Sequence, residues 1–466
     1  MPFHDVATNM HLLLLFFSIF SATFLPLILS RSFSIGGSSS EQSSEEDNGQ
    51  TYKSWDNAGD GNIWAVLVAG SSGWFNYRHQ ADICHAYHTL LAHGVAKERI
   101  ITMMFDDIAN NKHNPYPGKL FNEPGGKDVY EGVKIDYSGT EVNPENFEAV
   151  LLGDEQRSEG KPVLKSTEKD KVFVYFSDHG AVGVIGFPAA DLTVKQLTQT
   201  LKEMHAKKMY GELTFYLEAC ESGSMFDHTL AQSLKIYAVT AANGDESSWG
   251  CFCDTKFLPG NCLGDLFSVN WMQDSDQENL RTETLRKQFG IVREETNKSH
   301  VMHYGDLQIQ DEHVSEFMGK EQAQKPNERP PSPHKFPMFP SRDIPMFMMA
   351  RRQNESEQIQ HNLRVAWKKR SFLEQTIKQI VHQLVHDINN RRQILTTYPQ
   401  QIRDLDCHDE VVHTFSNFCF KFSENPYALK YVYVLANLCE RPELDAERIK
   451  MALIEQCAEV ELSGVI

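Results

Sequence analysis

The stretch FYLEACESGS, residues 215–224, is an apolar run that leads directly into a cysteine followed by small, turn-prone residues. Upstream, residues 172–180 read VFVYFSDHG, a second apolar run that ends in a histidine and a glycine. Short apolar runs bounded in this way are typical of buried strands. Because functional groups of open α/β sheets lie at the carboxyl ends of the strands, the two stretches place a thiol and an imidazole at one sheet edge. This pairing predicts a cysteine hydrolase.

Strand and helix patterns alternate on both sides of these stretches. Five apolar runs have the length and composition of strands: 63–70, 99–105, 172–177, 213–218 and 236–242. Two amphipathic segments, 77–93 and 194–207, have helical spacing. This alternation predicts an α/β fold with a mostly parallel sheet that is flanked by helices on both faces.

The C-terminal part has a different pattern. Residues 325–345 are rich in proline and show neither helical nor strand periodicity, which predicts an exposed linker. Beyond the linker, apolar residues recur at the spacing of one helix face from Ile377 to Ile388, and residues 427–438 and 446–457 repeat this pattern. The sequence therefore predicts a small helical domain after the α/β domain.

The N-terminal residues predict entry into the secretory pathway. Residues 12–29 form an apolar run that Pro26 interrupts, and the following residues are rich in serine and glycine, which favours a cleaved signal over a membrane anchor. Asn297 and Asn354 lie in sequons and are predicted glycosylation sites. The net charge of −18 argues against a nucleic-acid partner. We expect no membrane association once the signal is removed.

The nine cysteines fall into separate groups. Four lie in the predicted helical domain: Cys407, Cys419, Cys439 and Cys457. Two disulfides are expected there, with three pairings open. Cys253 and Cys262 bracket a short loop that they could close, and Cys84 has the setting of a buried apolar residue. Cys251 and Cys220 remain as free thiols, of which only Cys220 has a catalytic setting.

Cys220 and His179 are the candidate nucleophile and its acid–base partner. A thiol is mostly protonated at acidic or neutral pH, so Cys220 needs a base to become a nucleophile. The backbone N–H groups of Gly180 and Cys220 are candidate donors to an oxyanion, because glycine allows a carbonyl group to approach closely. His382 and His386 have the spacing of a metal pair but no third ligand nearby. We expect a solvated helix edge there, no metal and no cofactor.

Five longer motifs occur in order along the chain: NYRHQAD (76–82), FSDHG (176–180), EACESGS (218–224), ESSW (246–249) and LGDLFSVNWMQDSD (263–276). They resemble the legumain family, also called asparaginyl endopeptidases or vacuolar processing enzymes, and the wording resembles its plant branch. The resemblance runs from about residue 62 to the C-terminus. It implies a caspase-like α/β core, an inhibitory all-α prodomain, and cleavage of peptides and proproteins after Asn, less often after Asp.

The motifs also imply the roles of single residues. The resemblance makes Cys220 the nucleophile and His179 the acid–base residue, supported by Asn76. It further implies a substrate pocket with these residues: Arg78, Glu218, Ser248 and Asp265. A guanidinium and carboxylates together satisfy both ends of a carboxamide side chain. An ionised Asp would be repelled by Glu218 and Asp265, so cleavage after Asp is expected only in acid.

Pattern and resemblance together divide the chain into five segments: a signal peptide (1–30), a flexible propeptide (31–56), a catalytic domain (57–324), an activation linker (325–354) and a helical prodomain (355–466). The prodomain is expected to cover the cleft and to leave on acidification. Pairing between the two domains should lower the pKa of the carboxylates involved, and their protonation in acid would then break the pairs. Candidate cleavage points in the linker are Asn327, Asp343 and Asn354. The implied location is the secretory pathway, with the vacuole as its end point.

Three local features favour peptide ligation over hydrolysis in the terms of this family. Ala181 and Val182 follow the His-Gly pair, Cys251 follows a Trp-Gly pair, and the loop between Cys253 and Cys262 is short. An apolar leaving-group side would retain a peptide amine and admit water poorly. We therefore expect an Asn-specific cysteine endopeptidase with cyclising ligase activity near neutral pH. The alternatives are a purely hydrolytic vacuolar protease, a caspase-type Asp-directed protease, and a catalytically silent binding protein.

Overall fold

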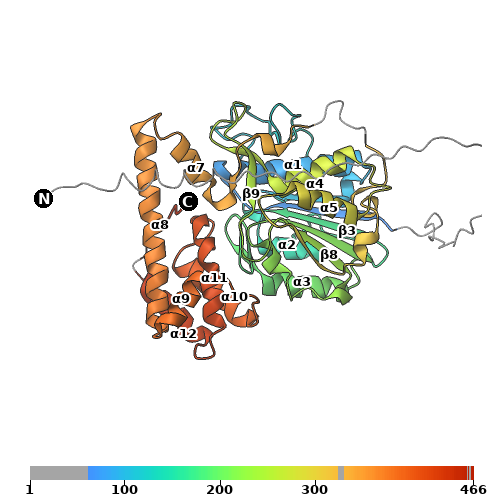
Figure 1. Ribbon diagram of the computed structural model, residues 1–466. Helices are drawn as coiled ribbons and strands as arrows, with labels where there is room; N and C mark the ends of the chain where they lie inside the picture. Colours follow the sequence, from blue (N-terminus) through green and yellow to red (C-terminus); the bar gives the residue numbers. More distant parts are fainter. Residues whose placement is uncertain (1–60, 324–329, 459, 461–462) are drawn as a thin grey trace, which may run out of the picture. The chain divides into compact units, whose positions relative to one another are not determined.

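The computed structural model describes residues 61–323, 330–458, 460 and 463–466 (Figure 1). The predicted signal peptide, the N-terminal propeptide and Asn327 lie outside these residues. Within the described residues, no helix combines the length and the apolar character that crossing a bilayer requires.

A six-stranded sheet forms the centre of the α/β domain, in the order β11-β8-β7-β3-β1-β2. Its strands are β1 (Ile63–Ala69), β2 (Ile100–Met104), β3 (Lys171–Ser177), β7 (Glu212–Glu218), β8 (Ile236–Thr240) and β11 (Met302–Gly305). All neighbours pair in parallel except β11, which is antiparallel to β8. The predicted fold class is confirmed, and each of the five predicted strands is present with ends shifted by at most two residues.

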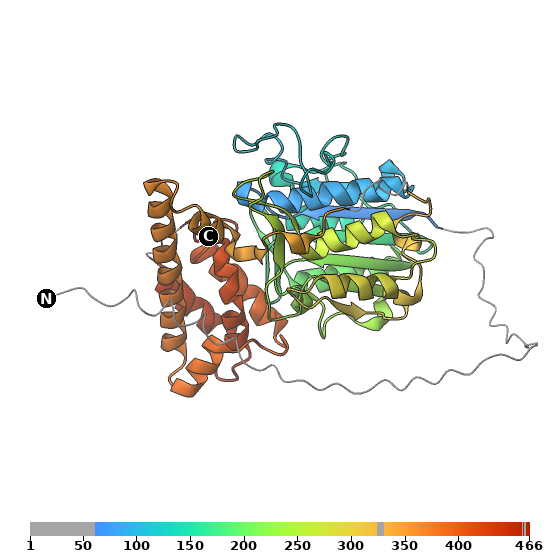
Figure 2. The ribbon, with the colours of Figure 1, turned by 45° about the horizontal axis from the view of Figure 1, so that its top comes forward.

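Helices cover both faces of this sheet (Figures 1 and 2). They are α1 (Tyr77–Ala92), α4 (Leu266–Gln277) and α5 (Leu285–Glu295) on one face, and α2 (Pro144–Leu151) and α3 (Val194–Ala206) on the other. On β3, Phe173 and Tyr175 pack into the core under α1, α4 and α5, while Val172 and Val174 pack into the core under α2 and α3. Successive strand residues point to opposite faces, so a strand covered on both sides is apolar throughout, as the sequence of β3 is.

The C-terminal residues form the predicted helical domain. Its helices are α8 (Glu357–Leu384), α9 (Ile388–Thr396), α10 (Leu405–Phe418), α11 (Val432–Cys439) and α12 (Ala446–Cys457). One correction concerns the first of them: α8 ends at Leu384, so Ile388 begins the next helix and is 71% exposed. His386 likewise lies beyond the end of α8, and the metal-pair spacing with His382 does not occur on one helix.

The disulfides settle the pairing that the sequence left open. Cys407 pairs with Cys439 and Cys419 with Cys457, which ties α10 to α11 and α12. Cys253 pairs with Cys262 and closes the short loop between β9 (Trp249–Cys253) and β10 (Cys262–Asp265), as predicted. The free thiols of Cys84, Cys220 and Cys251 are all buried.

The prediction that the linker is exposed is wrong for most of its described residues. Phe339 and Pro340 form a short strand, β12, that pairs antiparallel with β9, and α7 (Ile344–Arg351) follows. Ile344 and Met348 pack with the Cys253–Cys262 disulfide in a small apolar cluster. Proline-rich composition did not exclude this arrangement, because proline is tolerated in an edge strand and in the first turn of a helix. Asn354, beyond α7, is exposed as expected.

Candidate active site

The ends of β3 and β7 bring the predicted nucleophile and acid–base residue together. The two strands pair in register up to Glu218, and His179 and Cys220 each follow two residues after the strand end. The Asp178 N–H donates to the Glu218 carbonyl at 3.0 Å, which holds the two chain segments together beyond the sheet. A Cβ atom on Gly180 would lie 2.4 Å from the Cys220 carbonyl oxygen, so a glycine is required for this approach.

Hydrogen bonds fix the tautomer of His179. Its Nε2 lies 2.8 Å from Asn76 Oδ1, and Asn76 Nδ2 donates to the Ser72 carbonyl at 2.8 Å, which turns the amide oxygen toward the ring. Nε2 therefore carries the hydrogen. Nδ1 retains its lone pair and is buried without a hydrogen-bond partner among the described residues. Burial, reinforced by the positive charges of Arg78 and Arg342, lowers the pKa of His179, so the ring is neutral and can accept a proton at Nδ1.

The thiol of Cys220 is protonated in this state. The residue is completely buried, and burial raises the pKa of its thiol more than the nearby Arg342 lowers it. Among the described residues, Sγ bonds to the hydroxyl oxygens of Ser247 at 3.2 Å and Ser248 at 3.7 Å. Sequence analysis had placed Ser248 near the pocket and had not singled out Ser247.

Four predicted pocket residues converge beside Cys220. Arg78, fully buried on α1, donates through Nε to Asp265 Oδ1 at 2.8 Å. Glu218 Oε2 accepts from the backbone and the hydroxyl of Ser268 at 3.1 and 2.9 Å. Glu218 Oε1 and Asp265 Oδ2 are buried and have no hydrogen-bond partner among the described residues. Burial raises the pKa of both carboxyl groups, and His79 Nε2 lies 3.6 Å from Asp265 Oδ2. The pocket thus combines one guanidinium with two carboxyl groups that each have an oxygen without a hydrogen bond among the described residues.

The linker occupies this pocket. The Ser341 N–H donates to the Ser248 carbonyl at 2.9 Å, which continues the pairing of β12 with β9 by one residue. The Ser341 hydroxyl in turn accepts a hydrogen bond from Arg78 Nη2. An extended segment therefore runs along the strand edge beside Cys220 and puts a polar side chain on the pocket guanidinium.

The next linker residue forms a buried ion pair that sequence analysis missed. Arg342 donates to both carboxylate oxygens of Glu221 at 2.8 and 2.6 Å, and to the Gly180 carbonyl at 3.1 Å. Asp343 then accepts from Arg370 of α8 at 2.6 Å. The only available signal was the charged pair Arg342-Asp343 inside a proline-rich stretch, which a solvated loop would explain equally well.

The helical domain closes the other side of the site. His408 on α10 lies with Nε2 3.0 Å from the Val182 carbonyl, two residues beyond Gly180. Ser416 donates to Asp191 Oδ2 at 2.8 Å, where Asp191 begins β6 (Asp191–Thr193). The cavity beside Asn76 and His179 has a volume of about 30 Å³, and residues 422–429 of the helical domain complete its wall. That volume accommodates a water molecule and no peptide.

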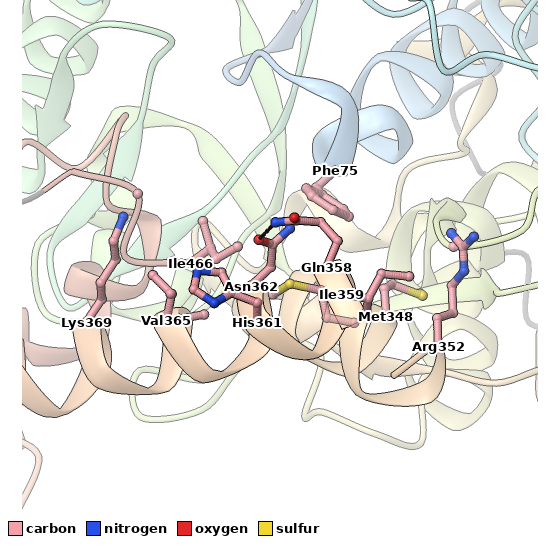
Figure 3. Close-up of a pocket in the computed structure, with 14 residues that line it drawn as sticks. Phe75, Met348, Arg352, Gln358, Ile359, His361, Asn362, Val365, Lys369 and Ile466 are labelled. Carbon is pink, nitrogen blue, oxygen red and sulfur yellow. Dashed lines mark hydrogen bonds between the residues drawn. The ribbon is translucent and has the colours of Figure 1, made fainter. Parts of the chain in front are cut away.

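A larger cavity of about 560 Å³ lies elsewhere, where Phe75 of the α/β domain faces α7, α8 and the C-terminal Ile466 (Figure 3). Gln358 and Asn362 of α8 are hydrogen-bonded to each other along its wall. None of the predicted site residues lines this cavity. The chemistry therefore belongs to the covered edge of the sheet and not to this larger cavity.

The structure also gives the positions of the residues for which the sequence predicted an effect on ligation. Ala181 and Val182 are buried in β4 (Gly180–Ala181) and the turn that follows it. Cys251 is completely buried on β9, and burial together with the charges of Asp82, Asp265 and Glu218 raises the pKa of its thiol. Cys251 therefore lies behind the pocket carboxyl groups.

His79 is a further residue that sequence analysis did not single out. Its ring packs edge-on against the ring of His179 with centroids 5.2 Å apart, and its Nδ1 lies 2.6 Å from Ser71 Oγ. Asp178 Oδ1 lies 3.4 Å from the same nitrogen, and burial raises the pKa of Asp178 to about 8. The position of His79 directly after Arg78 in NYRHQAD was the signal that could have identified it.

Asn297 and Asn354 are exposed, as glycosylation would require, and their modification stays a prediction. Within the described part of the chain, no group of three or more His, Cys, Asp or Glu side chains is arranged to hold a metal ion.

Comparisons with known proteins cover both domains. A family model described as the peptidase C13 family matches residues 63–320, and one described as the legumain prodomain matches residues 361–457. Legumain of Rattus norvegicus is 46% identical over 413 residues, which cover 85% of this chain and 93% of that protein. Legumain of Homo sapiens is 43% identical over 409 residues with the same coverage. The vacuolar-processing enzyme delta-isozyme of Arabidopsis thaliana is 38% identical over 439 residues, 88% of this chain and 93% of that protein.

Proposed function

This chain belongs to the peptidase C13 or legumain family of cysteine endopeptidases, and from that premise we propose that it is a zymogen whose active form cleaves peptides after asparagine, and after aspartate in acid. His179 Nδ1 removes the proton from Cys220 Sγ, and the thiolate attacks the peptide carbonyl. The imidazolium then gives that proton to the departing amine, which leaves an acyl-thioester on Cys220. Asn76 holds the imidazole in the required tautomer throughout.

The observation that carries the substrate class is the set of groups in the pocket. A carboxamide offers one acceptor oxygen and two N–H donors. Arg78 can donate to the oxygen once Ser341 has left, and the unpaired oxygens of Glu218 and Asp265 can accept from the N–H groups. The same site disfavours the alternative of a silent binding protein, since a protein without turnover has no need for a thiol, a base and its positioning amide at one sheet edge.

The test uses acid-activated enzyme and four peptides that differ only in the residue before the scissile bond: Asn, Asp, Gln and Ala. We expect cleavage of the Asn peptide at neutral and acidic pH, of the Asp peptide in acid, and little cleavage of the Gln and Ala peptides. Equal cleavage of the Ala peptide would contradict the proposed use of the pocket. The Asp-directed alternative predicts the reverse order of Asn and Asp at neutral pH.

We propose ligation as a second outcome of the same acyl-thioester. The support is the apolar pair Ala181 and Val182 directly after the His179-Gly180 pair, because apolar surface there would retain an amine and hinder water. An amine attacks only when deprotonated, and its pKa of about 8 makes ligation rise toward neutral pH. Mass spectrometry of an Asn-containing peptide at pH 6.5 separates cyclic, joined and hydrolysed products.

Wild-type enzyme is expected to give cyclic or joined peptide at that pH, and the variants Val182→Pro and Cys251→Gly are expected to shift the products toward hydrolysis. A linear acid as the sole wild-type product would leave hydrolysis as the only activity. We further propose the vacuole as the site of action, supported by the acid dependence above and by the similarity to a plant vacuolar-processing enzyme. A fluorescent fusion to the full chain tests this location.

A further inference from the structure

A buried asparagine lies behind the pocket carboxyl groups. Asn122 is 2% exposed, and its Nδ2 donates to Asp82 Oδ1 at 2.7 Å and to the Leu263 carbonyl at 3.1 Å. Its Oδ1 lies 2.8 Å from His85 Nδ1. Both amide hydrogens and the amide oxygen are therefore engaged, so the side chain has one orientation and links three separate segments of the chain.

Asp82 connects Asn122 to the pocket residues. It lies four residues after Arg78 on α1, which puts both side chains on the same helix face. The two carboxyl oxygens of Asp82 accept from the Asp265 N–H at 3.3 and 3.4 Å. Because Asp265 is the ion-pair partner of Arg78, the position of Asp82 bears on both charged walls of the pocket.

Asn122 is hydrogen-bonded to β10 on both sides of Gly264, directly on one side and through Asp82 on the other. It binds the Leu263 carbonyl directly and the Asp265 N–H through Asp82. A Cβ atom on Gly264 would lie 2.8 Å from Asn122 Nδ2 and 3.1 Å from Asp82 Oδ1, so the absence of a side chain there makes this close packing feasible. The strand that carries Asp265 is thus fixed by one amide from behind.

His85, which contacts Asn122, is itself held by an ion pair with Asp276. His85 Nε2 lies 2.9 Å from Asp276 Oδ2, and Thr89 donates to the other oxygen of Asp276 at 3.1 Å. Burial pushes the pKa of His85 down, but the Asp276 carboxylate and the bonds to Asp276 and Asn122 outweigh it and raise that pKa. Both amide hydrogens of Asn122 are used by Asp82 and Leu263, so its Oδ1 accepts from His85 Nδ1.

We propose that Asn122 is a positioning residue of the substrate pocket, which holds Asp82 and the strand of Asp265 so that the Arg78–Asp265 pair is set for a carboxamide. The inference rests on the proposed Asn specificity. Asn122 touches neither Cys220 nor His179 by any described contact, so its loss should impair binding of the substrate side chain and leave the covalent steps intact.

The experiment measures kcat and KM for the Asn peptide after titration of active sites. Two variants remove the amide donors of this residue: Asn122→Ala, and Asn122→Asp, which keeps the size of the side chain. Each is expected to raise KM about tenfold and to change kcat less than about threefold. Asp82→Ala should act in the same way, and Asp82→Asn, which can still accept from Asn122 and Asp265, should restore KM to within about threefold of wild type.

Gln273→Ala is the matched control, because Gln273 donates to Glu123 next to Asn122 and forms no described hydrogen bond with Asn122, Asp82 or His85. An unchanged KM in the Asn122 variants and in Asp82→Ala overturns the inference, even if their thermal stability or titratable fraction falls. Should Asn122→Ala not fold, the size-matched Asn122→Asp and the Asp82 pair decide. A wild-type enzyme that fails to cleave the Asn peptide refutes the proposed function instead, which keeps the two failures distinct.

Discussion

At the scale of single residues, burial has the same effect on both partners of the proposed catalytic pair. It raises the pKa of the Cys220 thiol and lowers the pKa of the His179 imidazole, so both groups are uncharged. A reactive thiolate needs the opposite arrangement, a negative sulfur beside a positive ring. Solvation of the two side chains would therefore move the pair toward the reactive ion pair.

Replacement of the nucleophile tests the assignment directly. Cys220→Ala is expected to give a folded zymogen that neither processes itself nor cleaves Asn peptides, with a loss of at least about a thousandfold. Cys84→Ala is the control, since Cys84 is an equally buried free thiol whose described partner is Met104 in the core. Turnover in Cys220→Ala comparable to that of Cys84→Ala would exclude Cys220 as the nucleophile.

The pocket predicts different pH profiles for two side chains. An Asn side chain does not ionise, so kcat/KM for an Asn peptide should change only severalfold between about pH 5 and pH 7. An Asp side chain has a pKa of about 4, and above it kcat/KM should fall about tenfold per pH unit because the ionised form meets Glu218 and Asp265. Parallel profiles for matched Asn and Asp peptides would contradict this account.

At the scale of elements, the linker covers the proposed site as a strand. Phe339 and Pro340 pair with β9, and the following residue reaches Arg78 in the pocket. Main-chain pairing at a sheet edge accepts many sequences, so the side chains decide how firmly the segment is held. Arg342 contributes most to this hold, because it donates to both carboxylate oxygens of Glu221 and to the Gly180 carbonyl while the linker is in place.

Loss of that hold should activate the uncut chain. Arg342→Ala leaves Glu221 buried without its cation, and breaking a buried pair in this way costs about 3–5 kcal/mol. We expect the zymogen variant to react with an active-site thiol probe at least about tenfold faster than wild type at neutral pH.

Arg351→Ala is the matched control, because its pair with Asp254 is half exposed and worth about 1 kcal/mol or less. Equal probe reactivity of the Arg342 and Arg351 variants would show that the ion pair to Glu221 does not restrain the linker.

The sequence predicted the strands well because each is covered on both faces and is apolar throughout. It also indicated the meeting of His179 with Cys220, since parallel strands end at one edge. It failed at residues 339–351, where a few side chains such as Ile344 and Arg342 are buried by partners more than eighty residues away in the chain. Asn122 could not be found for the same reason, because its partners lie on α1 and β10 and nothing local marks it.

At the scale of the whole molecule, the helical domain rests on the turns that follow His179. Thr193 donates to Asp409 at 2.6 Å, Ser416 donates to Asp191, and His408 meets the Val182 carbonyl. One carboxyl group of this interface, that of Asp191, departs from the lowered pKa that the sequence led us to expect. Burial raises the pKa of Asp191 to about 7, and a group of raised pKa favours the bound domain at low pH and opposes it as pH rises through 7.

His408 acts in the opposite direction. Burial lowers its pKa from 6.5 to about 4, and its Nδ1 has no hydrogen-bond partner among the described residues, so a second ring proton would be unpaired. A group of lowered pKa stabilises the bound domain fully above pH 6.5, and this stability is lost as pH falls from 6.5 to 4. The shift corresponds to about 3 kcal/mol in favour of release in acid.

His408→Gln removes this sensitivity, because glutamine stays neutral and can still donate to the Val182 carbonyl. We expect the midpoint of acid release to move downward by about one pH unit or more, measured as exposure of the active-site thiol during a pH titration. His382→Gln, at an exposed position of α8, is the control and should leave the midpoint unchanged. A midpoint that His408→Gln leaves in place would assign the acid response to other groups.

The two disulfides of the helical domain connect only its own helices, and the remaining cystine lies within the α/β domain. A cut in the exposed stretch near Asn354 would thus sever the last covalent tie and leave the helical domain as an intact, internally stapled body. Tethered inhibitors compete at an effective concentration of roughly millimolar, whereas a severed one is governed by its bulk concentration. After cleavage, dilution would relieve the inhibition, and a high concentration of the released domain would restore it. Activity after processing would therefore depend on compartment volume as well as on acidity.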